Sequence, residues 1–255
     1  QSRQVLEYLA ATDRPRFRSV SAGLLASPEI RPHLKHVVIG VLRQLTPVPE
    51  DWAAVDDVGW SQDPIAWPLL NLLTNPQWFD ATDQLGRWEQ WLADPDRVER
   101  AAHLLIFAAR QRGERASALV RPYIGTTEEW RIRMRALVAW SLTSALVPLA
   151  VELIEGGHID DARGPIAVNS DFWSIVHGLI EEDPAGAARV TGAFLRRGLN
   201  RAQAEGSADP FESEHLATHS PSEGVIREVA AKAPDKFIEE VLPFVIDVAQ
   251  ANQHE

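Results

Sequence analysis

Residues 172–204 read FWSIVHGLIEEDPAGAARVTGAFLRRGLNRAQA, two apolar runs on either side of Asp183-Pro184. Within each run, apolar side chains recur every three or four positions, which is the spacing of an amphipathic helix. Proline disfavours the helical conformation in the residue before it and suits the first turn of a new helix, whose free amides Asp183 can cap. Because almost no linker separates the runs, we expect two helices that fold back as an antiparallel hairpin.

The same pattern recurs along the chain. Its clearest other copies are residues 224–252 around Pro234 and residues 14–45 around Ser27-Pro28. Further hairpin turns are expected near positions 76, 113 and 145, which gives spacings of roughly 32–50 residues, close to the HEAT and armadillo periods of about 40–47. A single hairpin cannot bury both of its apolar stripes, whereas stacked hairpins can. The sequence therefore predicts an all-α fold: a right-handed α-solenoid of about six antiparallel helix hairpins, HEAT-like or armadillo-like.

Composition limits the classes of protein to consider. The chain has 255 residues and no cysteine, which excludes disulfides, thiol catalysis and Cys-ligated zinc. No apolar run approaches the ~20 residues that span a bilayer, and no signal peptide is recognisable. Arginine outnumbers lysine by 22 to 3, which indicates a high-GC bacterial genome. We expect a cytoplasmic protein with one helical-repeat domain over residues 1–255. The absence of an initiator Met predicts a processed chain or a fragment of a longer multidomain chain, and we expect the fragment.

The net charge of −11 is unevenly distributed. Residues 1–45 carry seven Lys or Arg against three Asp or Glu, residues 46–96 carry one against ten, and residues 97–135 carry nine against four. An acidic total argues against general nucleic-acid binding, which needs many cations that face phosphates. The alternation in sign is compatible with a surface for a protein partner, and equally with a series of solvated helices.

Several short motifs carry a resemblance to a known class of protein. They are Glu50-Asp51-Trp52, Asn75–Asp80 (NPQWFD), Ala162–Asn169 (ARGPIAVN) followed by Phe172-Trp173, and Glu239–Pro243 (EEVLP). The chain resembles the helical repeat region of large bacterial ATP-binding proteins of the NACHT and STAND type. There, repeats that sense a ligand or partner follow an NTPase core. The phosphate-binding motif GxxxxGK[ST] is absent from the chain, so the resemblance assigns no residue to ATP binding.

Aromatic and basic side chains supply the candidates for partner binding. Six of the nine tryptophans lie between Trp52 and Trp91, where a helical spacing favours a core role for three of them, Trp78, Trp88 and Trp91. Trp52 and Trp60 are the tryptophans nearest to loops, so we expect them to be exposed and consider them candidates for partner contacts. Four arginines mark the polar face of the second helix of the 172–204 hairpin, and the alternative for them is a solvated face without a partner. The candidate partner-binding residues are Trp52, Trp60, Arg189, Arg196, Arg197 and Arg201.

No pattern of catalytic or metal-binding residues stands out. His215 and His219 are four residues apart, a spacing at which two histidines on one helix can bind the same metal ion. Glu212 and Glu214 lie nearby in the sequence. The segment lies in a polar loop, however, and lacks the HExxH pattern, so we expect a solvated loop. His33 and His36 flank Lys35 on a surface face and are weaker candidates. The nucleophile motif GxSxG is also absent. We expect no metal, no cofactor and no catalytic residue.

The sequence therefore predicts a non-catalytic scaffold or sensor module that recognises a protein partner. The alternative from a different class is a HEAT-like DNA-repair glycosylase of the alkylpurine kind, which is also rich in tryptophan. That enzyme would need a basic concave channel for DNA, and the net charge of −11 argues against one.

Overall fold

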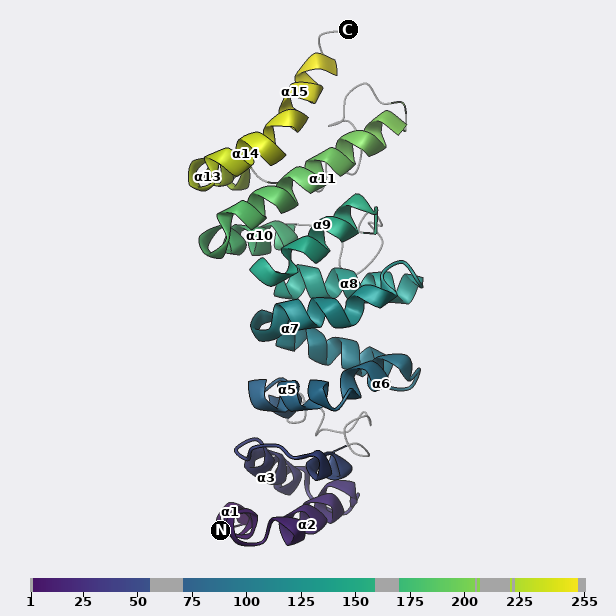
Figure 1. Cartoon of the computed structure of the whole chain (residues 1–255), viewed down its shortest axis with the longest axis vertical. Helices are drawn as coiled ribbons and strands as arrows, with labels where there is room; N and C mark the ends of the chain where they lie inside the picture. The colour runs from purple at the N-terminus through teal and green to yellow at the C-terminus, as the bar shows by residue number, and fades with distance from the viewer. Residues whose placement is uncertain are drawn as a thin grey trace. The chain divides into compact units, whose positions relative to one another are not determined.

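A computed structural model gives the structure of residues 2–55, 71–158, 170–204, 206, 221 and 223–251. Every regular element within these ranges is an α-helix or a 3-10 helix, and these ranges contain no β-strand (Figure 1). The expected all-α fold is confirmed. Contacts group the residues into two compact units, Gln1–Gln111 and Arg112–Glu255.

Unit 1 is built from short helices, and prolines or small polar residues mark most of their starts. Asp13 caps α2 by accepting a hydrogen bond from the Arg16 amide at 3.1 Å. Asn75 caps α5 in the same way, through the Gln77 amide at 3.1 Å. The elements are α1 (Ser2–Thr12), α2 (Arg14–Ala26), α3 (Pro32–Leu42), η1 (Pro49–Ala54), α5 (Pro76–Gln84), α6 (Arg87–Ala93) and the first part of α7 (Val98–Val120).

Unit 2 begins inside α7 and contains α11, a helix of 21 residues. Helix α11 contacts α9, α10, α13, α14 and α15, so it is the central helix of this unit. The elements after α7 are η2 (Arg121–Tyr123), α8 (Glu128–Ser141), η3 (Ser144–Leu146), α9 (Val147–Glu155), α10 (Ser170–Glu182), α11 (Pro184–Ala204), α13 (Glu223–Lys232), α14 (Pro234–Glu240) and α15 (Leu242–Ala251).

The turn at Asp183-Pro184 has the predicted geometry. Helix α10 ends at Glu182 and α11 begins at Pro184. Asp183 Oδ1 accepts a hydrogen bond from the Gly186 amide at 2.8 Å, which confirms the predicted cap. Its second oxygen accepts the Ser144 hydroxyl at 2.8 Å, so the same carboxylate also holds η3 against this turn. The expected turns near positions 28, 76, 145 and 234 also coincide with helix ends.

The helical path is interrupted at two places, one beside a glycine and one beside a proline. Arg112 has φ −133° and ψ 36°, which divides α7 next to Gly113. The second break lies at Val241, between α14 and α15. Pro243 cannot donate a backbone hydrogen bond, and its ring crowds the preceding turn, so a kink there is expected.

One helix start differs from the prediction by one residue. The stretch Thr126–Glu129 predicted a cap at Thr126, but the cap of α8 is Thr127, whose hydroxyl accepts the Trp130 amide at 3.2 Å. Thr126 donates instead to the Tyr123 carbonyl at 2.8 Å. Some sequence predictions lie outside the described residues: the helix start expected at Asp63-Pro64, the Ala162–Asn169 motif, and Ser220 and Ser222 of the cap expected over Ser220–Glu223.

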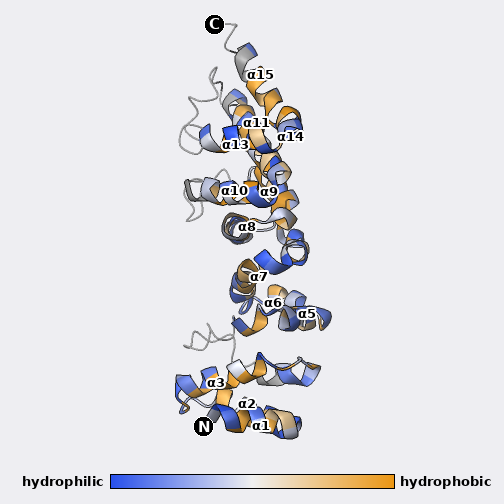
Figure 2. Cartoon of the chain, turned by 90° about the vertical axis from the view of Figure 1, so that its left-hand side faces the viewer, coloured by the Kyte–Doolittle hydropathy of each residue, from blue (hydrophilic) through white to orange (hydrophobic). Residues whose placement is uncertain are grey.

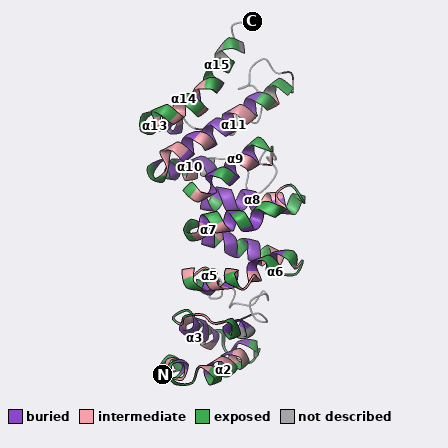
Figure 3. Cartoon of the chain, in the orientation of Figure 1, coloured by how far each residue is buried: buried purple, intermediate pink, exposed green. Residues whose placement is uncertain are grey.

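The core of unit 1 is rich in tryptophan. Trp78, Trp88 and Trp91 are all buried, as the sequence predicted. The ring centroids of Phe79 and Trp88 lie 5.1 Å apart, and those of Trp88 and Trp91 lie 5.3 Å apart in an edge-to-face arrangement. Such pairs are more favourable than the buried area alone implies. Figure 3 shows the buried residues as purple bands along the helices.

Candidate functional site

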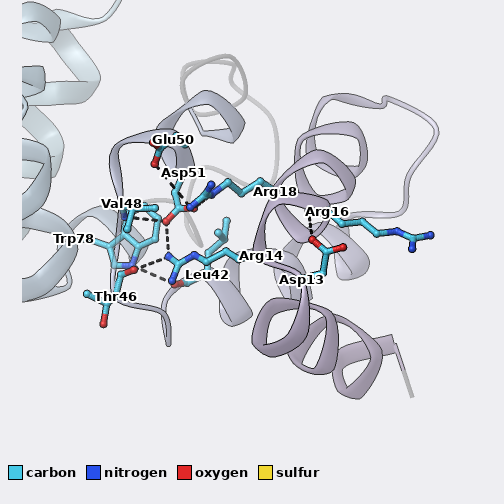
Figure 4. Close-up of polar contacts among 10 residues, drawn as sticks. All are labelled: Asp13, Arg14, Arg16, Arg18, Leu42, Thr46, Val48, Glu50, Asp51 and Trp78. Carbon is cyan, nitrogen blue, oxygen red and sulfur yellow. Dashed lines mark hydrogen bonds and ion pairs between the residues drawn. The ribbon is translucent and has the colours of Figure 1, made fainter.

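A buried carboxylate connects α2 to η1 in unit 1. Asp51 has no solvent exposure, and Arg14 Nη2 and Arg18 Nε approach its two oxygens at 2.6 and 2.7 Å (Figure 4). The Val48 amide also donates to Asp51, at 3.0 Å. Arg14 Nη2 further donates to the Thr46 carbonyl at 2.5 Å. Removing one partner from such a buried, hydrogen-bonded ion pair is costly, so we assign this cluster to the stability of unit 1.

Trp52, which follows this carboxylate, is buried, and the prediction that it would be exposed is wrong. Its ring centroid lies 4.9 Å from that of Trp78, and the Trp78 indole donates to the Leu42 carbonyl at 3.2 Å. The two arginines hold η1 against α2, which turns Trp52 towards the core. Trp60, the other predicted aromatic contact, lies outside the described residues.

The four candidate arginines of α11 are all half-buried. Arg196 is used within unit 2: its Nη1 donates to the Glu240 carbonyl at 2.8 Å and to Glu240 Oε2 at 3.2 Å. Its Nη2 lies 3.4 Å from Glu155 Oε1. Arg197 and Arg201 also have interactions within the chain. Arg189 lies two turns before Arg196 on the same side of the helix. A partner-binding role for these four arginines stays a prediction.

The role of Arg196 follows from the break at Val241. The interruption of the helix brings the Glu240 carbonyl close to α11, where the guanidinium satisfies it. At Gly192 the two segments approach so closely that a Cβ atom would lie 2.2 Å from this oxygen. Only glycine fits such an approach without movement of the backbone.

A second set of charges joins α10 to α13. Lys232 pairs with Glu181 and with Glu228, the latter at 3.0 Å, and His177 Nδ1 lies 3.0 Å from Glu228 Oε2. The hydrogen bond from Lys232 lowers the pKa of Glu181 below its usual value. The hydrogen bonds to Glu181 and Glu228 raise the pKa of Lys232. Glu181 therefore favours the folded state above its usual pKa, and that contribution is lost as the pH falls through the lowered value.

Trp140 is a large aromatic side chain that the sequence analysis did not single out as a contact residue. It is 56% exposed at the end of α8, although the preceding stretch Met134–Ala139 is buried. The sequence predicted a helix that carries Trp130, Leu137, Val138 and Trp140, and the first three are buried. Helical periodicity alone gives no signal that separates Trp140 from them.

Other large apolar side chains are exposed on helices of both units. They belong to α1, α2 and α7 in unit 1 and to α14 and α15 in unit 2. Along with Trp140, the exposed large apolar residues are Val5, Tyr8, Val20, Phe107, Ile238, Val245 and Ile246.

The described part of the chain shows no group of three His, Asp or Glu side chains placed to bind a metal ion. His33 and His36 are exposed on α3, whereas His215 and His219 lie outside the described residues. Within the described ranges, no helix has the length and apolarity that crossing a membrane requires.

Comparison with known proteins finds no match: no family model, no curated protein and no solved structure matches this chain.

Proposed function

We propose that the chain is a non-catalytic scaffold or sensor module that binds a protein partner in the bacterial cytoplasm. We further propose that its helix pairs are HEAT-like repeats, stacked in the right-handed sense of an α-solenoid. Turns at proline and the close packing of successive helix pairs around α11 support the repeat assignment. The motif resemblance supports a place in a larger NACHT- or STAND-type protein.

The observation that carries the binding role is the exposure of Trp140. Its side chain is 56% exposed, while the six residues before it are buried. Because Met134–Ala139 fixes the end of α8 in the core, this tryptophan is presented from a rigid support. Tryptophan is among the residues most enriched at the energetic centres of protein interfaces. An aromatic side chain held in this way loses little conformational entropy on binding.

We expect Trp140→Ala to weaken partner binding at least about tenfold and to leave the fold intact, because interface tryptophans commonly contribute about 2 kcal/mol or more. A photo-crosslinking amino acid at position 140 would first capture the partner from cells of the source bacterium, and calorimetry with the purified partner would then give the affinity.

The matched control is Phe107→Ala, which removes an exposed aromatic residue of α7. It should leave the affinity unchanged. An unchanged affinity for Trp140→Ala, with the partner still bound, would contradict the role of this residue. If crosslinking from position 140 captures only small molecules or nucleic acid, that result would contradict the protein-binding function itself.

The glycosylase alternative makes a different prediction. With a net charge of −11, the chain should bind duplex DNA weakly or not at all at an ionic strength of about 0.15 M. Fluorescence anisotropy with a labelled duplex measures this directly. Tight binding at that ionic strength would favour the DNA-repair enzyme over the protein-binding module.

A further inference from the structure

The last two helices of unit 2 are apolar on two faces, and one of these faces is covered. Phe237, Val241 and Phe244 form the inner stripe, at the i, i+4, i+7 spacing of one helix face. They pack against Leu195 and Leu199 of α11. The stripe continues across the break at Val241, so α14 and α15 present it to α11 together.

The other face is open to solvent. Ile238, Val245 and Ile246 are 58%, 46% and 46% exposed, and half-buried Leu242 lies between them on the same face. We call these four residues the outer stripe. Figure 2 colours much of α15 as hydrophobic, and Figure 3 shows exposed residues along it. A helix that is apolar on both sides is normally buried on both sides, and exposed apolar patches mark interaction surfaces.

The first helix of unit 1 has a comparable surface. Val5 and Tyr8 of α1 are 65% and 71% exposed, and their spacing of three places them on one face. Val20 of α2 is 38% exposed. We call Val5 and Tyr8 the N-terminal face.

The two surfaces lie in segments of opposite charge. Residues 2–45, which contain α1 to α3 and the residues just after α3, carry seven Lys or Arg against three Asp or Glu, a net of +4. Residues 223–251, which form α13 to α15, carry three against six, a net of −3. Glu50 and Asp51 pair with Arg14 and Arg18 of the first segment. When these two carboxylates are counted with it, the net charge of the first segment is still +2.

Charge therefore selects among the ways in which two copies can meet. Two outer stripes would bring acidic segments together, and two N-terminal faces would bring basic segments together. Like charges placed across an interface cost free energy, whereas opposite charges accelerate association and favour the correct partner. The contact with complementary charge is the one between the outer stripe of one molecule and the N-terminal face of another.

We propose that a second copy of this chain covers the outer stripe through its N-terminal face. The contact is heterologous, so each pair keeps one unused outer stripe and one unused N-terminal face. Association therefore continues beyond the dimer unless the assembly closes. This homotypic contact is separate from the partner role of Trp140 and does not depend on it.

Sedimentation velocity over a range of concentrations tests the proposal. The unmodified chain should form species whose mass grows with concentration and which dissociate as salt is raised. Ile246→Asp and Tyr8→Asp should each be monomeric, because each lacks one of the two surfaces. An equimolar mixture of the two variants should form dimers and nothing larger, because it contains one intact surface of each kind.

The replaced side chains are exposed, so both variants should keep the helical circular dichroism of the parent. Phe107→Asp is the matched control, since it places a carboxylate on an exposed apolar residue outside both surfaces, and its self-association should be unchanged. A monomeric parent at its highest soluble concentration would overturn the proposal. So would dimers formed by either variant alone, because pairing between identical surfaces needs only one of the two. A mixture that stays monomeric although each variant abolishes association would also overturn it, because one intact surface of each kind would then be insufficient for contact. None of these results would affect the proposed role of Trp140.

Discussion

Replacing Asp51 by alanine is expected to lower the free energy of unfolding of unit 1 by about 3 kcal/mol. The substitution leaves Arg14 and Arg18 without the carboxylate that they share, and it leaves the Val48 amide without its acceptor. Loss of one partner of a buried ion pair typically costs about 3–5 kcal/mol. We expect the lower end of that range because the two arginine side chains are 26% and 22% exposed and can recover some hydration.

The matched control is its neighbour Glu50. Glu50 also approaches Arg18, at 3.8 Å, but its side chain is 68% exposed. Glu50→Ala should therefore change stability by less than about 1 kcal/mol, as is usual for a surface pair. Hydrogen exchange of peptides from residues 14–54 would give the local free energy of opening for each variant. Equal effects of the two substitutions would show that burial of Asp51 contributes nothing.

Replacing Gly192 by alanine is expected to detach α14 and α15 from α11. The new Cβ atom would lie 2.2 Å from the Glu240 carbonyl oxygen and 2.8 Å from its carbon, so backbone rather than a flexible side chain has to move. Such overpacking costs about 1–3 kcal/mol. The movement would also weaken the hydrogen bond from Arg196 to the same carbonyl.

Gly178 of α10 is the control for this substitution. Apart from the adjacent residues and the backbone of its own helix, no heavy atom lies within 4 Å of the Cβ position at Gly178, so alanine fits there without a clash. Gly178→Ala should stabilise the protein by up to about 1 kcal/mol through its better helix propensity. The same gain at Gly192 is outweighed by the clash.

Hydrogen exchange would also locate the damage from Gly192→Ala. In a stack of repeats, each pair contacts only its neighbours, so protection should fall in residues 223–251 and persist in unit 1. A uniform loss of protection across the chain would contradict the repeat model. Unchanged protection in residues 223–251 would contradict the close approach of α11 to the break at Val241.

Local chemistry made much of the secondary structure predictable. A proline after a capping residue ends one helix and starts the next within a few residues. The turn at Asp183-Pro184 could therefore be predicted from the local sequence. The kink near Pro243 was predictable for the same reason, because the missing N–H and the ring act on the neighbouring turn. The start of α8 was misplaced by one residue because Thr126 and Thr127 can both cap a helix.

The candidate contact residues were less predictable. Trp52 was expected to be exposed and is buried, whereas Trp140 is exposed although it shares a predicted helix with the buried residues Leu137 and Val138. Helical periodicity identifies the apolar side of a helix, but it does not say which part of that side another element covers. The exposure of the outer stripe of α14 and α15 was not predictable for the same reason. Its residues are apolar like those of the inner stripe, which α11 covers.

The sequence by itself determined that this chain is helical, where most of its helices begin and end, and that Trp78, Trp88 and Trp91 lie in the core. Only the tertiary structure showed which charges meet. Asp51 lies 37 and 33 residues from Arg14 and Arg18, and Glu240 lies 44 residues from Arg196. Capping and helix breaking act within a few residues and are visible in a short stretch of sequence. Ion pairing and exposure depend on which distant segments pack together, and that is decided when the whole chain folds.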